Sequence, residues 1–155
     1  MDDCVCESDP DLPHVNFHKH TDTTPVNDWS YMYLGYFLEN ETQGMAFVQA
    51  YHDVIQKKGN FEGDLVVEGL DTCHNQNMLY RLRDPDRLPP ETACLKRLAS
   101  SIPVIIEWPG HHRGGAHVVY LDGHQEFVSY PGKFPMTRQF IGALQLIDTE
   151  IYPIR

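Results

Sequence analysis

Positive charge is scarce in this sequence. The 155-residue chain has 12 lysine and arginine residues against 22 aspartate and glutamate residues, which gives a formal net charge of -10 at pH 7. Its few basic residues do not form a run. A nucleic-acid-binding surface needs clustered positive charge to release counterions from phosphates. The composition therefore argues against a nucleic-acid partner.

Long apolar runs are lacking as well. No stretch approaches the roughly 20 apolar residues that cross a bilayer. The first residues, MDDCVCESDP, are acidic, whereas a secretory signal begins with basic residues and continues with an apolar run. We therefore expect no membrane span within these residues. The 41% hydrophobic content is enough for the core of one globular domain.

The local signatures of several enzyme classes are missing too. The sequence has no GxSxG, HExxH, GxxxxGK[ST] or GxGxxG motif, which are the signatures of α/β-hydrolases, zinc metalloproteases, P-loop proteins and dinucleotide-binding domains. Cys73 beside His74 is a poor nucleophile and base pair, because adjacent residues seldom present both groups to one substrate atom. We identify no catalytic residue and expect a non-enzymatic domain.

Cysteine is rare, and no two cysteines form a CxxC pair. The four residues are Cys4, Cys6, Cys73 and Cys94. Their spacing does not fit a structural zinc site or a redox motif, and their even number fits disulfides better. The natural pair to test is Cys73 with Cys94, whose bond would close a loop of about 20 residues and add roughly 3 kcal/mol to stability. Two unrelated buried thiols are an equally open alternative.

The sequence does contain short segments with regular patterns of apolar residues. Residues 1–28 have little apolar periodicity and are expected to form an irregular acidic arm that contains histidines, and residues 29–155 a single globular domain. Within it, the aromatic segment 29–38 predicts a strand or a buried extended segment. Apolar residues at steps of three and four predict a helix over about 41–58, which ends at the KKGN sequence.

Shorter segments predict the rest of the domain. A short helix is expected to start near Pro90 and to end before Pro103, and a C-terminal helix is expected over TRQFIGALQLID, with its threonine as the cap. The strand candidates are GDLVVEGL, NMLYRLRD and PVIIEW (103–108).

Two further strand-like runs, AHVVYL and HQEFVSY, flank Asp122-Gly123. This dipeptide is the strongest short-range signal for a two-residue hairpin turn, because it tolerates positive φ. Such a turn would pair His117 with Val128. It would also separate His117 from His124 by about 13 Å at roughly 3.3 Å per residue, which is too far for one metal ion. The same register predicts that Val118, Tyr120 and Phe127 form the core face of the hairpin.

His112 lies in the connection before the hairpin, among residues that favour turns, including Gly114 and Gly115. A structural role is the leading hypothesis for it, with a hydrogen bond to backbone or to Asp122. A metal site using His112 and Asp122 is the alternative. Calcium prefers six to eight oxygen ligands, so a metal bound at His112 would be a transition metal.

The pattern of His112, nine residues and then Asp122-Gly123 resembles a known family. The stretch HRGGAHVVYLDGH, which includes Gly114 and Gly115, together with its flanks IPVIIEW and HQEFVSYPGKFPMT, looks like the prepilin-type processing-associated domain of Planctomycetes-type pseudopilin-like proteins. The segment SYMYLGYFLENETQGMAFVQAY is similar to this group as well, so the resemblance covers most of residues 29–137.

The resemblance implies an extracytoplasmic α+β domain similar to the head of a type II secretion pseudopilin. Together with the expected elements it gives a small antiparallel sheet with a C-terminal β-hairpin, packed against one long and one or two short helices. Its partners would be proteins of a pseudopilus or envelope assembly. Members of the group carry the head on an N-terminal hydrophobic helix, and these residues contain no such segment. The membrane and assembly roles are thus expected of a full-length protein.

Two other functions compete with a head domain. The first is a metal-binding or metal-dependent hydrolytic domain, with ligands drawn from His14, His18, His20, His111 and His112. The second is a carbohydrate or peptide binder with exposed Trp29, Tyr31 and Trp108. Aromatic residues in strand-like runs are more often core, which weakens the second alternative.

Overall fold

A computed structural model describes residues 31–57, 63–73, 77–83 and 92–151. The expected arm over 1–28 lies outside these ranges, and so do His14, His18, His20 and Trp29. No helix in the described ranges is long and apolar enough to span a bilayer.

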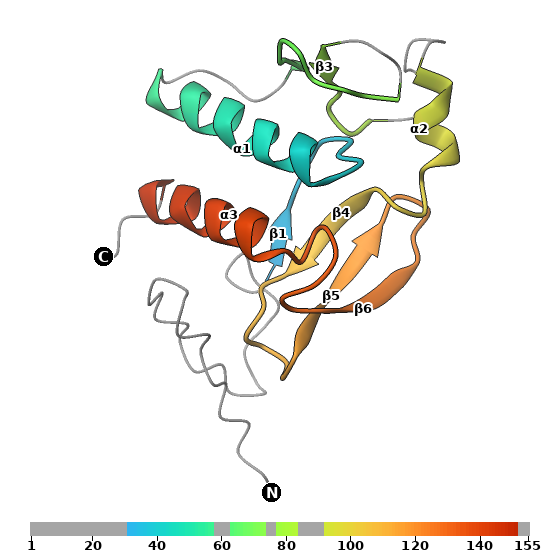
Figure 1. Ribbon diagram of the computed structural model, residues 1–155, viewed down its shortest axis with the longest axis vertical. Coiled ribbons are helices and arrows are strands. Elements are labelled where there is room, and N and C mark those ends of the chain that lie inside the picture. The colour runs from blue at the N-terminus through green and yellow to red at the C-terminus, as the bar shows by residue number, and fades with distance from the viewer. Residues whose placement is uncertain (1–30, 58–62, 74–76, 84–91, 152–155) are drawn as a thin grey trace, which may run out of the picture.

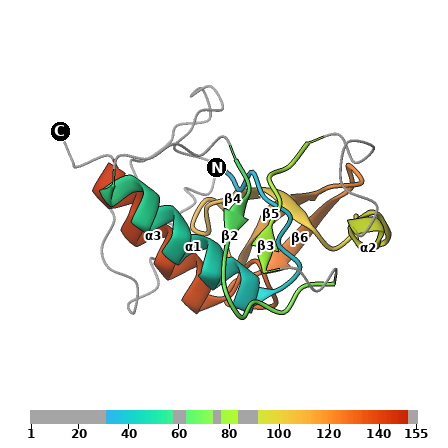
Figure 2. The same cartoon turned by 90° about the horizontal axis from the view of Figure 1, so that it is seen from above.

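The fold is α+β, as expected, and is built on one antiparallel sheet (Figure 1). Its four strands follow the order β1-β4-β5-β6. The strands are β1 (Tyr31–Tyr33), β4 (Pro103–Glu107), β5 (Gly115–Tyr120) and β6 (Gln125–Ser129). Two helices, α1 (Glu41–Gln56) and α3 (Arg138–Ile151), lie side by side and cover one face of the sheet (Figure 2).

A smaller unit adjoins the main sheet. It contains the two-stranded sheet of β2 (Leu65–Val66) and β3 (Met78–Leu79) and the short helix α2 (Ala93–Arg97). The candidate disulfide is formed: Cys73 and Cys94 are bonded, with their Cα atoms 6.0 Å apart. The bond ties the segment between β2 and β3 to α2.

Side-chain caps fix where the long helices begin. The Asn40 side chain accepts a hydrogen bond from the Gln43 N–H at the start of α1, and the Thr137 hydroxyl accepts one from the Phe140 N–H before α3. These caps confirm the predicted starts of both helices. α1 ends at Gln56, slightly earlier than predicted. α2 begins at Ala93, later than the expected start near Pro90.

The sheet has one buried face and one open face, because strand residues alternate in direction. Ile106, Ala116 and Val118 point inward and are 0% exposed beneath the helices. Trp108 is also core, at 4% exposed, as its strand-like context predicted. The other face, called here the outer face, carries Tyr33 at 55% and Phe127 at 47% exposed.

The hairpin is present, but its predicted register is wrong by one residue. The Tyr120 N–H donates to the His124 carbonyl, and the Gly123 N–H donates to the Tyr120 carbonyl, so the loop contains three residues. Gly123 has φ 88°, the left-handed conformation that a three-residue loop requires near its end. Consequently His117 pairs with Phe127 and not with Val128. Phe127 therefore belongs to the outer face, and only Val118 and Tyr120 confirm the predicted core face.

Candidate metal centre

A cross-strand row of side chains forms the base of the candidate site on the outer face. Tyr31 of β1 pairs with Glu107 of β4, and His117 of β5 pairs with Phe127 of β6. Glu107 and His117 are joined directly: the Glu107 Oε2 atom lies 3.0 Å from the His117 backbone nitrogen and 2.9 Å from its Nδ1 atom. Strand pairing thus brings together two polar residues that are ten positions apart in the sequence.

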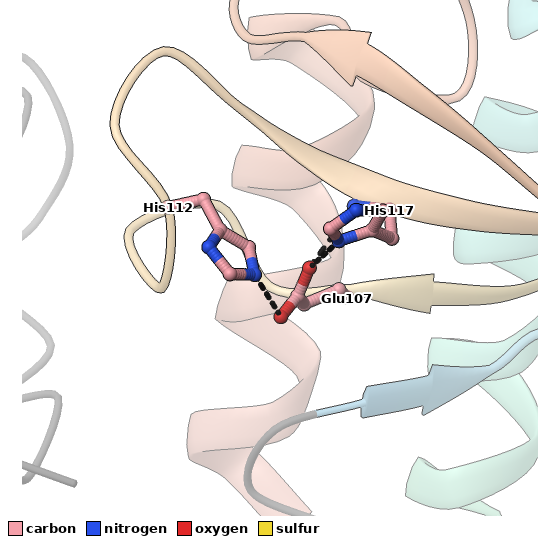
Figure 3. Close-up of side chains that lie close together, drawn as sticks. All are labelled: Glu107, His112 and His117. Carbon is pink, nitrogen blue, oxygen red and sulfur yellow. Dashed lines mark hydrogen bonds and ion pairs between the residues drawn. The ribbon is translucent and has the colours of Figure 1, made fainter. Parts of the chain in front are cut away.

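His112 reaches the same carboxylate from the loop between β4 and β5. The loop turns sharply, with Gly114 at φ 83°, and His112 forms an isolated bridge with Gly115. This turn places the His112 Nε2 atom 3.2 Å from the Glu107 Oε1 atom. Figure 3 shows the Glu107 carboxylate between the two imidazoles, with one oxygen facing each ring.

These three residues have the geometry of a metal-ligand set. One ligand atom from each of Glu107, His112 and His117 can be chosen so that all lie within 4.8 Å of one another. Imidazole nitrogens and a carboxylate oxygen are common ligands of zinc and of other divalent transition metals. The cluster is therefore capable of holding a metal ion with three protein ligands.

The burial of the three ligands is uneven. The Glu107 side chain is only 5% exposed, whereas the side chains of His112 and His117 are 49% and 36% exposed. A carboxylate taken out of water is costly unless it has hydrogen-bond donors or a cation beside it. Glu107 meets this requirement through the two imidazoles and one backbone N–H. The histidines leave one side of the cluster open to solvent.

Phe127 packs against the edges of both rings. Its ring centroid lies 5.2 Å from that of His117 and 6.3 Å from that of His112, in edge-on arrangements. Gly115 makes this position of the phenyl ring accessible: a Cβ atom at Gly115 would lie 2.9 Å from the Phe127 ring and 2.3 Å from the Val128 carbonyl oxygen. The second glycine of the motif thus leaves room for the neighbouring strand and for the aromatic side chain against the histidines.

A hollow of about 280 Å³ adjoins the cluster on the outer face. Its apolar part comes from Ile105 and Val119, which pair with each other across β4 and β5. Tyr31 and Gln125 also line it. The hollow therefore combines the Glu107, His112 and His117 cluster with a small aliphatic surface.

The structure separates His112 from its expected metal partner, Asp122. Asp122 follows the far end of β5 from His112, and its Oδ1 atom lies 2.5 Å from the Nδ1 atom of His124. Hydrogen bonds from the His124 ring and from its backbone N–H lower the pKa of Asp122. The structure therefore places His112 beside Glu107 and Asp122 beside His124, and it does not bring His112 and Asp122 together.

The other residues of the motif lie in turns or at the start of a strand. Gly114 lies in the turn after His112, Gly115 begins β5, and Asp122 and Gly123 form the hairpin loop. His111, which was a candidate ligand, is not part of the cluster.

Glu107 and His117 are the members of this candidate cluster that sequence reasoning missed. Glu107 follows four apolar residues of a predicted buried strand. An isolated acid in such a strand was the one sequence feature that could have marked it as a functional residue. The sequence placed His117 only relative to His124 across the hairpin, because the pairing of β4 with β5 is not visible in local sequence patterns.

Comparisons of the chain with models of protein families, with curated proteins and with solved structures found no match.

Proposed function

We propose that this domain binds one divalent transition-metal ion through Glu107, His112 and His117. The observation that carries the proposal is the buried Glu107 carboxylate, which faces one ring nitrogen of each histidine at 3.2 Å and 2.9 Å. Two nitrogen ligands favour zinc, copper, nickel or iron(II) over calcium or magnesium, which prefer oxygen. Three protein ligands leave at least one coordination position for water or another ligand.

Binding is better supported than hydrolysis at this site. Glu107 is the sole carboxylate among the lining residues that the structure describes, and as a metal ligand it would not be free to act as a general base. We therefore propose a binding function, in keeping with the expected non-enzymatic domain.

Calorimetric titration of tag-free, metal-stripped protein with Zn²⁺ tests the proposal. The parent protein is a His14→Ala, His18→Ala, His20→Ala variant, so that the histidines of residues 1–28 contribute nothing. We expect one ion per chain, and a loss of at least about 100-fold in affinity in His112→Ala and in His117→Ala, which exceeds the usual effect of an outer-shell change. His124→Ala is the matched control, because His124 pairs with Asp122 outside the cluster. Unchanged affinity in both ligand variants would contradict the site.

We also propose that the domain serves as the extracytoplasmic head of a pseudopilin-like protein, with structural or protein-binding roles in a secretion or pilus-type assembly. The proposal is supported by the motif spacing from His112 to Asp122-Gly123 and by the α+β fold. The Cys73–Cys94 disulfide favours it as well, because disulfides persist mainly in oxidising compartments outside the cytoplasm.

Mass spectrometry of the native protein, isolated from its source cells, tests this second proposal. We expect an N-terminal hydrophobic helix with a processed and methylated first residue, and Cys73 and Cys94 that resist alkylation until they are reduced. A native protein that is found in the cytoplasm, has no processed helix and has Cys73 and Cys94 as free thiols would refute the head-domain role. This result would not bear on the proposed metal site.

A further inference from the structure

We propose that the open coordination position of the metal takes a small aliphatic carboxylate, which lies in the hollow beside the cluster. The inference rests on the proposed metal function and names the ligand class of that site. It is carried by three properties of the hollow, namely its charge, its aliphatic surface and its size.

The charge of the site favours a single negative group. A divalent ion bound to the one carboxylate of Glu107 and to two neutral imidazoles leaves a net charge of about +1 in the cluster. Among the described residues that line the hollow, Glu107 is the sole acid, so one further carboxylate would neutralise the cluster. Without the metal, the nearby Glu107 carboxylate would repel the same ligand. Carboxylate binding is therefore expected to depend on the metal.

The surface next to the cluster fits a short aliphatic body. Ile105 and Val119 form the next cross-strand pair beyond Glu107, and both are half-buried, so part of their apolar surface remains open. Tyr31 and Gln125 also line the hollow, and their side chains carry hydrogen-bond donors of the kind that a carboxylate oxygen accepts from. At about 280 Å³ the hollow lies near the lower end of the range for small-molecule sites, which limits the ligand to a few carbon atoms.

Visible absorption of the Co²⁺-loaded protein tests the inference, because a new ligand on cobalt changes its absorption bands. The probe is isobutyrate, and the neutral isobutyramide is its isosteric control. We expect a saturable spectral change with isobutyrate only. In Val119→Thr, which keeps the shape of the side chain but replaces one methyl group by a hydroxyl, we expect roughly fourfold weaker isobutyrate binding with unchanged Co²⁺ affinity.

The outcomes separate the two proposals. Failure to take up Co²⁺ would refute the metal site itself. Uptake of Co²⁺ with no response to isobutyrate, or with an equal response to isobutyramide, would overturn the ligand inference alone. A glycine-rich peptide that ends in valine with a free carboxylate tests whether the bound carboxylate comes from a free acid or from the end of a polypeptide. Tighter binding of this peptide than of isobutyrate indicates the end of a polypeptide, and equal or weaker binding indicates a free acid.

Discussion

Glu107 lies in a strand whose other residues are apolar, and its carboxylate has been taken almost entirely out of water. Each carboxylate oxygen faces one histidine, and the oxygen that faces His117 also accepts that residue's backbone N–H. This arrangement fixes the carboxylate before any metal arrives. The three candidate ligands would therefore need little rearrangement to bind the proposed ion, which would lower the entropy cost of binding.

Phe127 is expected to act as a positioning residue for the two imidazoles. Phe127→Ala removes the ring that packs edge-on against His112 and His117, so we expect about 10-fold weaker Zn²⁺ binding, in the range of outer-shell changes. Thermal unfolding should change little, because Phe127 is 47% exposed. The matched control is Tyr33→Ala, an aromatic residue 55% exposed on the same face. Equal zinc affinity in the two variants would rule out the positioning role.

Gly115 is expected to tolerate no side chain. Gly115→Ala would place a Cβ atom 2.3 Å from the Val128 carbonyl oxygen, and we expect a loss of about 1–3 kcal/mol in the free energy of unfolding. Gly142→Ala in α3 is the control, because its Cβ atom would meet nothing within 4 Å beyond its chain neighbours and the nearby backbone of its own helix, and it should stabilise the protein by about 0.5–1 kcal/mol. Urea denaturation measures both. The packing explanation fails if the two variants shift stability in the same direction.

At the scale of elements, local patterns predicted the helices and strands, and they failed where non-local pairing decides. The start of α1 at Glu41 and the threonine cap of α3 follow from local rules. The hairpin loop took one more residue than the predicted two, and this difference moved Phe127 from the expected core to the outer face. The metal ligands could not be predicted together, because Glu107 and His117 meet only through the pairing of β4 with β5.

The hairpin loop should make stability depend on pH through Asp122. Hydrogen bonds from His124 lower the pKa of Asp122 below its ordinary value in the folded protein, so its stabilising effect is present at pH values above the unfolded-state pKa and is lost as the pH falls through the folded pKa. Asp122→Asn removes this contribution. Calorimetric melting temperatures between pH 5 and 2.5 should show the parent more stable at pH 5 and the difference shrinking at lower pH. A difference that stays constant with pH would contradict the role of the Asp122 carboxylate.

At the scale of the whole molecule, the core has two parts. The larger cluster joins α1 and α3 to the sheet, and the smaller one surrounds Cys94, Leu95 and Ile102 near α2. The Cys73–Cys94 disulfide crosses 21 sequence positions and holds α2 to the segment between β2 and β3. Both cysteines lie outside the metal cluster, so stability and metal binding should be separable.

Removal of the disulfide should weaken the fold without weakening the site. For the Cys73→Ser, Cys94→Ser variant we expect a loss of about 3 kcal/mol in the free energy of unfolding, because the open loop gives the unfolded chain more freedom. Zn²⁺ affinity at a temperature where the variant is folded should match that of the parent protein. Reduction with dithiothreitol should destabilise the parent and leave the variant unchanged. A parallel loss of zinc affinity would show that the smaller unit supports the metal centre.

X-ray absorption spectroscopy of the zinc-loaded protein tests the proposed metal centre itself, because it reports the atoms bound to the ion. The measurement is made on the variant without His14, His18 and His20, loaded with one equivalent of Zn²⁺. The structure predicts two imidazole ligands with Zn–N distances of about 2.0–2.1 Å and oxygen ligands for the remaining positions, with one imidazole lost in His117→Ala. A spectrum without imidazole scattering, or one that His117→Ala leaves unchanged, would contradict the proposed metal centre.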